Sequence, residues 1–243
     1  MDETLSTYQR LQNDLSEIIQ KAPKGAKLPA EPDLAKQLGV SRATLREAMR
    51  TFESQGFLRR RQGSGTYVVG PSRVIESGLE ILESLETQAE KIGLDVVMGK
   101  CDVTHIKANP SQAKKLGIPE KSDVVKVSRV ILTEGSPAAY LIDIFPEGIL
   151  SEKELEEDFR GSVLDLLIRK GDPLLSMSKT EISAIHAPSD VAKALDIQRG
   201  DTLLLLHALL FDQEGEPIDL SHSYFLPGNF RFHIIRKIGG VNQ

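Results

Sequence analysis

The chain has 243 residues, of which 40% are hydrophobic, so it is long and apolar enough for two domains with separate cores. It contains no apolar run of membrane-spanning length, and its N-terminal stretch MDETLSTYQRLQND is polar and acidic, so we expect neither a membrane helix nor a secretory signal. A single cysteine excludes an internal disulfide and fits a cytoplasmic location. The formal net charge of −5 is unevenly spread, because residues 1–70 carry +3 and the remainder carries −8.

The first seventy residues predict three helices. Residues 5–21 have apolar side chains at helical spacing, and a short helix with an apolar face follows around Leu34. Gly39-Val40 makes a turn, and Ser41 is a good N-cap for the third helix. The third helix presents a core-facing stripe formed by Leu45, Ala48, Met49 and Phe52.

A second face of the third helix carries Arg42, Arg46 and Arg50, each four residues from the next. Cations in that array repel one another, so the face favours an external anion. Ser41 and Thr44 add hydroxyl groups at the N-terminal end, where the helix dipole also favours phosphate. A helix docked by its N-terminus after a short helix and a turn is the way in which helix-turn-helix proteins read the major groove.

A basic hairpin follows the third helix. Residues 57–61 and 66–69 predict two strands, and Gln62-Gly63-Ser64-Gly65 predicts the turn between them. No Lys-Ser/Thr follows the glycines, so the turn is not expected to be a nucleotide-phosphate loop. Taken alone, the arginines could be a solvated face and the glycines a plain turn; together with a hairpin that forms a wing, they favour nucleic-acid binding.

Motifs along this head resemble the GntR family of bacterial transcription regulators. The matching residues are Leu28-Pro29-Ala30-Glu31, Leu34-Ala35, the run VSRATLREA at 40–48 and the run QGSGT at 62–66. The resemblance covers nearly all of residues 8–69 and implies operator contacts by Arg42, Thr44, Arg46, the turn serine and the wing-tip glycine. The full set of expected DNA contacts is Ser41, Arg42, Ala43, Thr44, Arg46, Arg50, Gln62, Gly63 and Ser64.

Two residues depart from the family pattern. Ala30 stands where a serine often caps the first helix of the motif, so we expect no side-chain cap there. Pro32 stands where the family usually has an arginine that contacts DNA. Operator affinity or sequence preference can therefore differ from that of relatives.

The rest of the chain predicts a mixed, mostly antiparallel α+β domain. Gly70-Pro71-Ser72 marks the boundary, and residues 73–92 predict a connecting helix despite Gly78. Expected strands are 94–106, 124–133, 138–145, 177–185, 202–211, 217–225 and 230–235. Expected short helices are 111–116, 151–157, 162–170 and 189–195, with Ser111 and Ser189 as N-caps of the first and last.

An approximate internal repeat lies within this second part. NPSQAKKLG at 109–117 and APSDVAKAL at 187–195 are each followed by a strand, an EGxP turn and another strand. Duplicated halves of this kind predict one sheet with a ligand groove where they meet. The expected domains are residues 1–70 (winged helix-turn-helix), 71–92 (linker and connecting helix) and 93–243 (effector binding and dimerisation).

The repeat, placed after such a head, resembles the UTRA effector domain of the HutC branch over roughly residues 80–236. The resemblance implies a chorismate-lyase-like fold and a small-molecule effector that alters DNA affinity. It also implies a homodimer on a pseudo-palindromic operator, with one recognition helix for each half-site. We expect a cytoplasmic repressor without a cofactor.

Many members of this branch bind sugar phosphates through an Arg-x-Arg strand and a glutamate after the turn proline. This chain keeps Arg129 but has Ile131 and Leu141 at the other two positions, so an amino-sugar phosphate is not expected. We expect instead an aromatic or heterocyclic effector with one anionic group for Arg129. The candidate effector residues are Arg129, Tyr140, Asp143, His207, Asp219, Ser221 and Tyr224.

Two other functions are possible on the residues alone. The five histidines lack metal-ligand spacing and there is no GxSxG motif, so we expect no catalytic and no metal site; the lyase-like fold is only an analogy. An effector-independent DNA-binding protein is the other alternative, and the acidic second domain argues against it.

Overall fold

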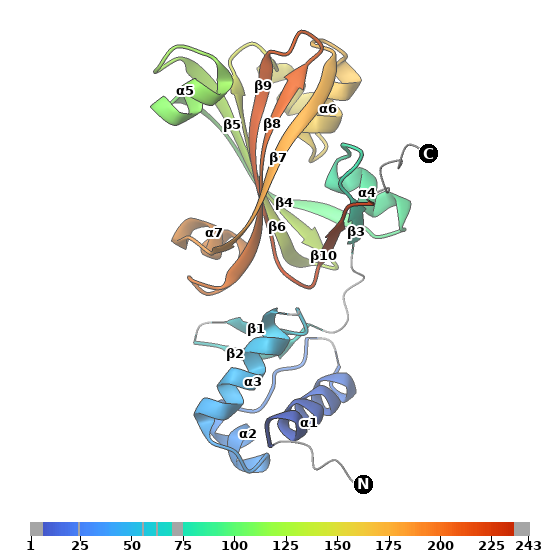
Figure 1. Cartoon of the computed structure of the whole chain (residues 1–243), viewed down its shortest axis with the longest axis vertical. Helices are drawn as coiled ribbons and strands as arrows, with labels where there is room; N and C mark the ends of the chain where they lie inside the picture. Colours follow the sequence, from blue (N-terminus) through green and yellow to red (C-terminus); the bar gives the residue numbers. More distant parts are fainter. Residues whose placement is uncertain (1–6, 24, 55, 62, 70–74, 236–243) are drawn as a thin grey trace, which may run out of the picture. The chain divides into compact units, whose positions relative to one another are not determined.

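The computed structural model describes residues 7–23, 25–54, 56–61, 63–69 and 75–235 (Figure 1). The chain forms two compact units. One contains residues 1–74 with His186–Leu203 and Leu226–Asn229, and the other contains the remaining residues from Ile75 onward. Below, "head" means the described residues 7–69 and "body" means residues 75–235. The expected domain boundary at 70–72 lies outside the described residues.

Three helices and a hairpin make up the head, which confirms the predicted winged helix-turn-helix. They are α1 (Thr7–Lys21), α2 (Glu31–Gln37), α3 (Arg42–Ser54), β1 (Leu58–Arg61) and β2 (Gly65–Val68). The apolar stripes of the helices meet in one buried cluster, where Leu15, Leu34 and Leu45 are fully covered. The two wing strands are antiparallel, with Leu58 opposite Val68.

The two helices of the motif begin differently. The Ser41 hydroxyl oxygen accepts a hydrogen bond from the backbone N–H of Thr44 at 3.1 Å, so the predicted N-cap of α3 is confirmed. Ala30 precedes α2 and provides no side-chain cap, as expected. The carboxylates of Glu31 and Asp33 in the first turn of α2 are favourably placed for its dipole.

Six strands form one sheet in the body, in the order β4-β5-β6-β9-β8-β7. Their bounds are β4 (Val96–Lys107), β5 (Asp123–Thr133), β6 (Ser136–Pro146), β7 (Leu175–His186), β8 (Thr202–Asp212) and β9 (Pro217–Phe225). The two halves of the internal repeat meet at β6 and β9, where Asp143 lies opposite Ser221 in an antiparallel register. The repeat therefore forms a single sheet, as predicted.

Short helical segments connect the strands: α5 (Pro110–Leu116), the π-helical turn η1 (Glu154–Asp158), α6 (Val163–Lys170) and α7 (Ser189–Leu195). The expected N-cap at Ser111 is wrong, because Pro110 already occupies the first turn and Asn109 caps α5. Asn109 accepts from the Gln112 N–H and donates its own N–H to the Gln112 side chain, both at 2.9 Å. The expected N-cap at Ser189 is also wrong, because α7 begins directly after Pro188, which has no side-chain acceptor.

The expected helix over 73–92 is wrong for its first half. Ile75–Gly78 is strand β3, which pairs in parallel with β10 (Phe230–His233), and the helix in this region is α4 (Leu85–Lys91). Ser84 caps α4 by accepting from the Thr87 N–H at 3.0 Å, which fixes its late start. Local periodicity could not reveal this, because the partner of β3 lies some 150 residues away along the chain.

No helix among the described residues has the length and hydropathy to cross a membrane.

Candidate DNA-binding face and effector site

The arginine face of α3 is exposed but partly neutralised by carboxylates. Arg46 donates from Nε and Nη2 to Glu31 at 3.1 and 2.6 Å, and Arg50 pairs with Glu47 at 3.4 Å. Arg42 makes no ion pair among the residues that the structure describes. The three arginines are therefore not equivalent, and Arg42 is the one whose charge is most available to an incoming phosphate.

The N-terminal end of α3 gathers the predicted polar contacts. Ser41, Arg42 and Ala43 are exposed and Thr44 is half-buried. The hydroxyl groups of Ser41 and Thr44 lie 2.8 Å apart and share a hydrogen bond. The structure thus places these four residues together at the positive end of the helix dipole.

The wing tip is braced by an aromatic residue that the sequence analysis did not select. The hydroxyl groups of Ser64 and Tyr67 are 2.6 Å apart, and the Arg61 guanidinium lies over the Tyr67 ring at 5.2 Å. Gly63 has φ +72°, the left-handed region in which glycine is favoured. Gln62, also expected to contact DNA, lies outside the described residues. Tyr67 alternates with inward-facing residues on β2, and that alternation is the only sequence signal that marked it as outward-facing.

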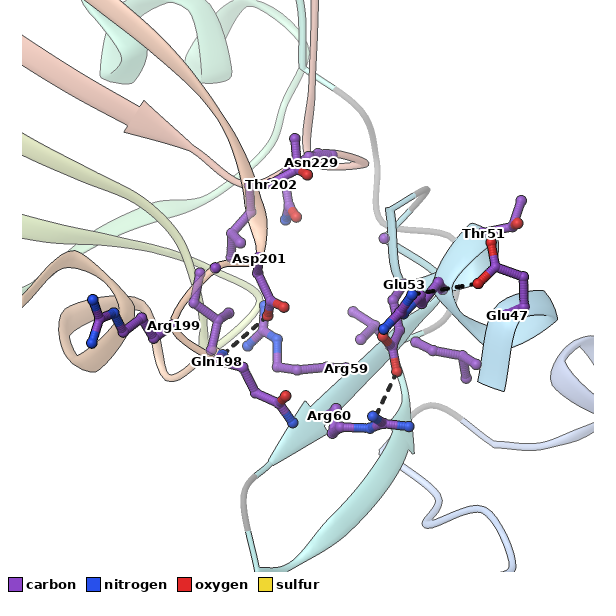
Figure 2. A pocket seen from close by; sticks show the side chains of 18 residues that line it. Glu47, Thr51, Glu53, Arg59, Arg60, Gln198, Arg199, Asp201, Thr202 and Asn229 are labelled. Carbon is purple, nitrogen blue, oxygen red and sulfur yellow. Dashed lines mark hydrogen bonds and ion pairs between the residues drawn. The ribbon is translucent and has the colours of Figure 1, made fainter. Parts of the chain in front are cut away.

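A pocket of about 550 Å³ lies within the first unit (Figure 2). Charged side chains dominate its lining, among them Arg59, Arg60, Glu53 and Asp201. Arg60 Nε lies 3.6 Å from Glu53, so opposite charges already neutralise each other here. None of the seven predicted effector residues lines this pocket, so it is not the predicted effector site.

The predicted effector residues divide between the two faces of the body sheet. Side chains alternate along a strand, and in the observed register Arg129 pairs with Leu141, whereas Tyr140 pairs with Val130. Arg129 and Tyr140 therefore point to opposite faces. One face carries Arg129, Asp143, Asp219 and Ser221; the other carries Tyr140, His207 and Tyr224.

On the first face, Arg129, Asp143, Asp219 and Ser221 form what we call the polar band, which crosses the sheet between two apolar clusters. The α6 cluster contains Val127 and Phe145, next in line on β5 and β6. The α4 cluster contains Ile131 and Leu141, next in line on the other side. The four polar residues thus lie between two hydrophobic clusters, and none of them is a member of either cluster.

Arg129 is the centre of the polar band. It is 4% exposed, its Nη1 donates to the carboxylate of Asp143, and its guanidinium lies 5.7 Å from the centre of the Phe159 ring. Asp219 is equally buried, and its carboxyl group lies within the electrostatic reach of both Asp143 and Arg129. The strands thus bring three of the seven predicted residues close together, with Arg129 and Asp143 in direct contact.

Glu86 on α4 completes this site and was not predicted. Its Oε1 is buried without a hydrogen-bond partner, and burial raises the pKa of this carboxyl group although Arg129 acts in the opposite direction. Burial, together with the neighbouring Asp143, raises the pKa of Asp219 well above its ordinary value. No local signal distinguishes Glu86 from other acidic residues in LETQAEK; only the fold places it near Arg129.

On the opposite face, aromatic rings line up along β6, β8 and β9. Tyr140 stacks on Tyr224 with ring centres 6.3 Å apart, and His207 meets His222 edge-on at 4.5 Å. Burial and the neighbouring His207 and Lys115 lower the pKa of His222 to about 4, so it is neutral at pH 7.

Across the described parts of the chain, no three His, Cys, Asp or Glu side chains are grouped to hold a metal ion.

Two family models match the chain. Residues 4–68 match the model described as "Bacterial regulatory proteins, gntR family", and residues 93–231 match the UTRA domain. The structure is similar to that of PhnF from Mycobacterium smegmatis, with a TM-score of 0.62 at 22% identity over 94% of this chain and all of that one, which shows the fold.

Curated relatives agree with the two models. The chain is 28% identical over 205 residues to the HTH-type transcriptional repressor NagR of Bacillus subtilis, covering 84% of this chain and 83% of that protein. It is 28% identical over 204 residues to the histidine utilization repressor of Pseudomonas aeruginosa, covering 82% and 79% of the two chains. The chain belongs to the gntR family of bacterial regulatory proteins, in the group that carries a UTRA domain.

Proposed function

We propose that the protein is a transcription repressor whose affinity for operator DNA is set by a small molecule bound in the body. The observation that carries this proposal is the N-terminal end of α3, where Arg42 is exposed beside Ser41 and Thr44 in a winged head. This arrangement offers a charge, hydroxyl donors and a helix dipole to one duplex groove. Relatives of the chain are named transcriptional repressors.

In this proposal the DNA contacts fall into two groups. Ser41, Arg42, Ala43, Thr44, Arg46 and Arg50 lie on or next to α3 and enter the major groove. Gln62, Gly63 and Ser64 form the wing tip and contact the backbone or the minor groove. Arg46 contacts DNA while Glu31 holds its guanidinium in place, so its contribution depends on that carboxylate.

The protein acts as a homodimer on a pseudo-palindromic operator, with its two recognition helices about one helical turn of DNA apart. A single head would bury too little surface for tight, specific binding at physiological salt. Because it acts on chromosomal DNA, we place it in the cytoplasm. We propose domain limits of 1–70, 71–92 and 93–243. The middle segment contains β3 and α4.

The effector binds at the polar band, between the two apolar clusters. An amino-sugar phosphate is a poor ligand here, because Ile131 and Leu141 are buried apolar residues next to Arg129 and add no donor or carboxylate. The other three predicted effector residues, Tyr140, His207 and Tyr224, lie on the opposite sheet face and do not belong to this site.

The body can signal to the head through α4. Glu86 lies in the first turn of α4, and α4 packs with Ile75 of β3 in the same apolar cluster (Figure 1). β3 is the first described element after the head. A ligand that moves Glu86 therefore acts on the segment that leads to the DNA-binding head, and it shifts the population of heads able to bind an operator.

We propose no enzymatic role, since the described site has no nucleophile paired with a base. The alternative of effector-independent DNA binding leaves the polar band unexplained, because unpaired buried polar atoms there lower stability without a function.

The test uses the full chain and an operator selected from a random duplex pool, with binding followed by fluorescence anisotropy at fixed salt. Metabolites that raise the melting temperature are then added to the complex. A stabilising metabolite that changes operator affinity supports the proposal. Tight operator binding that no stabilising metabolite alters supports the effector-independent alternative, and turnover of a metabolite supports the enzyme.

A further inference from the structure

Three polar atoms around Arg129 are buried without a hydrogen-bond partner in the structure. They are Arg129 Nε, Asp219 Oδ1 and Glu86 Oε1. Arg129 and Asp219 are each 4% exposed. Buried polar atoms in folded proteins are nearly always paired, so three unpaired atoms in one site indicate a missing polar partner.

Carboxyl groups outnumber cations in the site. Arg129 supplies one positive charge, which Asp143 on the neighbouring strand already neutralises through a direct hydrogen bond. Asp219 and Glu86 add two further carboxyl groups, both within the electrostatic reach of Arg129. An anionic ligand would have to compete with Asp143 for the same guanidinium and approach two more carboxylates.

Glycine 161 leaves room beside Glu86. A Cβ atom at this position would lie 3.1 Å from Glu86 Oε1, and Gly161 has φ +114°, a conformation that other residues rarely adopt. The residue Glu86 is half-buried, although its Oε1 is covered.

We propose that the effector carries a positively charged nitrogen group, an amine or amidine, which binds at the buried carboxyl groups around Arg129, those of Glu86 and Asp219. This inference rests on the proposed function, in which the body binds the effector. Such a group has N–H donors for the unpaired carboxyl oxygens of the site, which an anion lacks. It replaces the sequence-based expectation of an anionic group held by Arg129.

This binding is expected to depend on pH. The charged and titratable groups that face the site are Glu86 of α4, Asp165 of α6, Cys101 of β4, Arg129 of β5, Asp143 of β6 and Asp219 of β9. Because the pKa values of Glu86 and Asp219 are raised, protons compete with a cation for these carboxyl groups. Affinity for a cation then rises with pH, by up to about tenfold per pH unit for each proton released.

The probes are benzylamine, benzyl alcohol and benzoate, with agmatine as a second cation of different shape. Melting temperature and calorimetric affinity are measured on the full chain at millimolar probe concentrations. The variants are Glu86→Gln and Asp219→Asn, which remove the charge while keeping the size of the side chain. Glu181→Gln is the matched control, because Glu181 is exposed and lies near His207 on the other face.

We expect at least one of the two cations to stabilise the protein, and neither the alcohol nor benzoate to do so. Glu86→Gln and Asp219→Asn should each weaken that cation about tenfold or more and flatten its pH dependence, whereas Glu181→Gln should leave both unchanged. Stabilisation by benzoate, no stabilisation by either cation, or full affinity in both site variants overturns the inference.

The same samples separate this inference from the proposed function when operator binding is measured. A cation that binds at Glu86 without changing operator affinity supports the charge class of the ligand and contradicts effector control. If benzoate binds and changes operator affinity, the result contradicts the inferred charge class of the ligand and supports effector control.

Discussion

Arg46 of α3 donates two hydrogen bonds to one carboxylate oxygen of Glu31, the first residue of α2. The other oxygen of Glu31 accepts from Arg60 of the wing strand β1. One carboxylate therefore links α2, the recognition helix and the wing, and it orients Arg46 on the face proposed to meet DNA. The hydrogen bond from Arg46, together with the charge of Arg60, lowers the pKa of Glu31, although partial burial opposes this.

The first prediction concerns this carboxylate. Glu31→Gln removes the charge that orients Arg46 and Arg60, so we expect operator affinity to fall by about five- to tenfold relative to Asp33→Asn. Asp33 is the matched control, because it lies in the same turn, is exposed and has no ion pair in the described residues. The two variants remove equal charge from the DNA-binding side of the head. Equal operator affinities at the same salt, measured by anisotropy, would show that Glu31 acts only through its charge.

The second prediction concerns the recognition helix. Arg42→Ala and Arg46→Ala should each lower operator binding by about 1–3 kcal/mol if the side chain contacts a base. Arg10→Ala on α1 is the control, because Arg10 is an exposed arginine outside the proposed contact face. Anisotropy titrations at two salt concentrations separate a base contact, which alters sequence preference, from a phosphate contact, which alters the salt slope. Unchanged binding by both variants would remove α3 from its proposed role.

The third prediction concerns the buried ion pair of the polar band. Asp143→Ala leaves the Arg129 guanidinium buried without its partner, and this should lower the free energy of unfolding of the body by about 3–5 kcal/mol. Asp123→Ala removes an exposed partner of Lys107, at 2.7 Å, and should cost no more than about 1 kcal/mol. Urea unfolding followed by far-UV circular dichroism compares the two. Similar losses in both variants would mean that Asp219 or Glu86 replaces Asp143 as the partner of Arg129.

The head was predictable because its signals are local. The stripe from Leu45 to Phe52, the cap at Ser41 and the glycines of the wing turn are each read within a few residues, and the structure confirms all three. β3 was missed because Ile75 is buried by a strand from the other end of the chain. Periodicity cannot report such a pairing.

The polar band proposed as the effector site was only partly predictable, for a geometric reason. The sequence identified polar residues on β5, β6, β8 and β9, but side chains on a strand alternate, so register decides which of them share a face. The observed register brings together Arg129 and Asp143 and sends Tyr140 to the other side. Glu86 could not be selected, since its neighbours in the site belong to three different strands.

The last prediction concerns the start of η1 and follows from pH. The carboxylate of Glu154 accepts hydrogen bonds from the Ser151 N–H and hydroxyl, both at 2.7 Å, and pairs with Lys170 at 3.1 Å. The backbone and side-chain hydrogen bonds from Ser151 are the main reasons why the pKa of Glu154 is lowered to about 2. A carboxyl group whose pKa is lower in the folded state stabilises the fold above its unfolded pKa, and this stabilisation disappears as the pH falls towards the folded value.

Glu154→Gln should therefore lower the free energy of unfolding by about 1 kcal/mol at pH 7, the usual value of a helix-capping contact. The difference from the wild type should stay constant down to about pH 5 and then shrink steadily towards pH 2. Glu156→Gln is the control, because Glu156 is exposed on the same turn. Urea unfolding at a series of pH values measures both differences. A Glu154→Gln deficit that stays undiminished at pH 2 would show that the side chain acts through packing, since nearly all of the charge-linked stabilisation is lost in the wild type once the pH reaches its folded pKa.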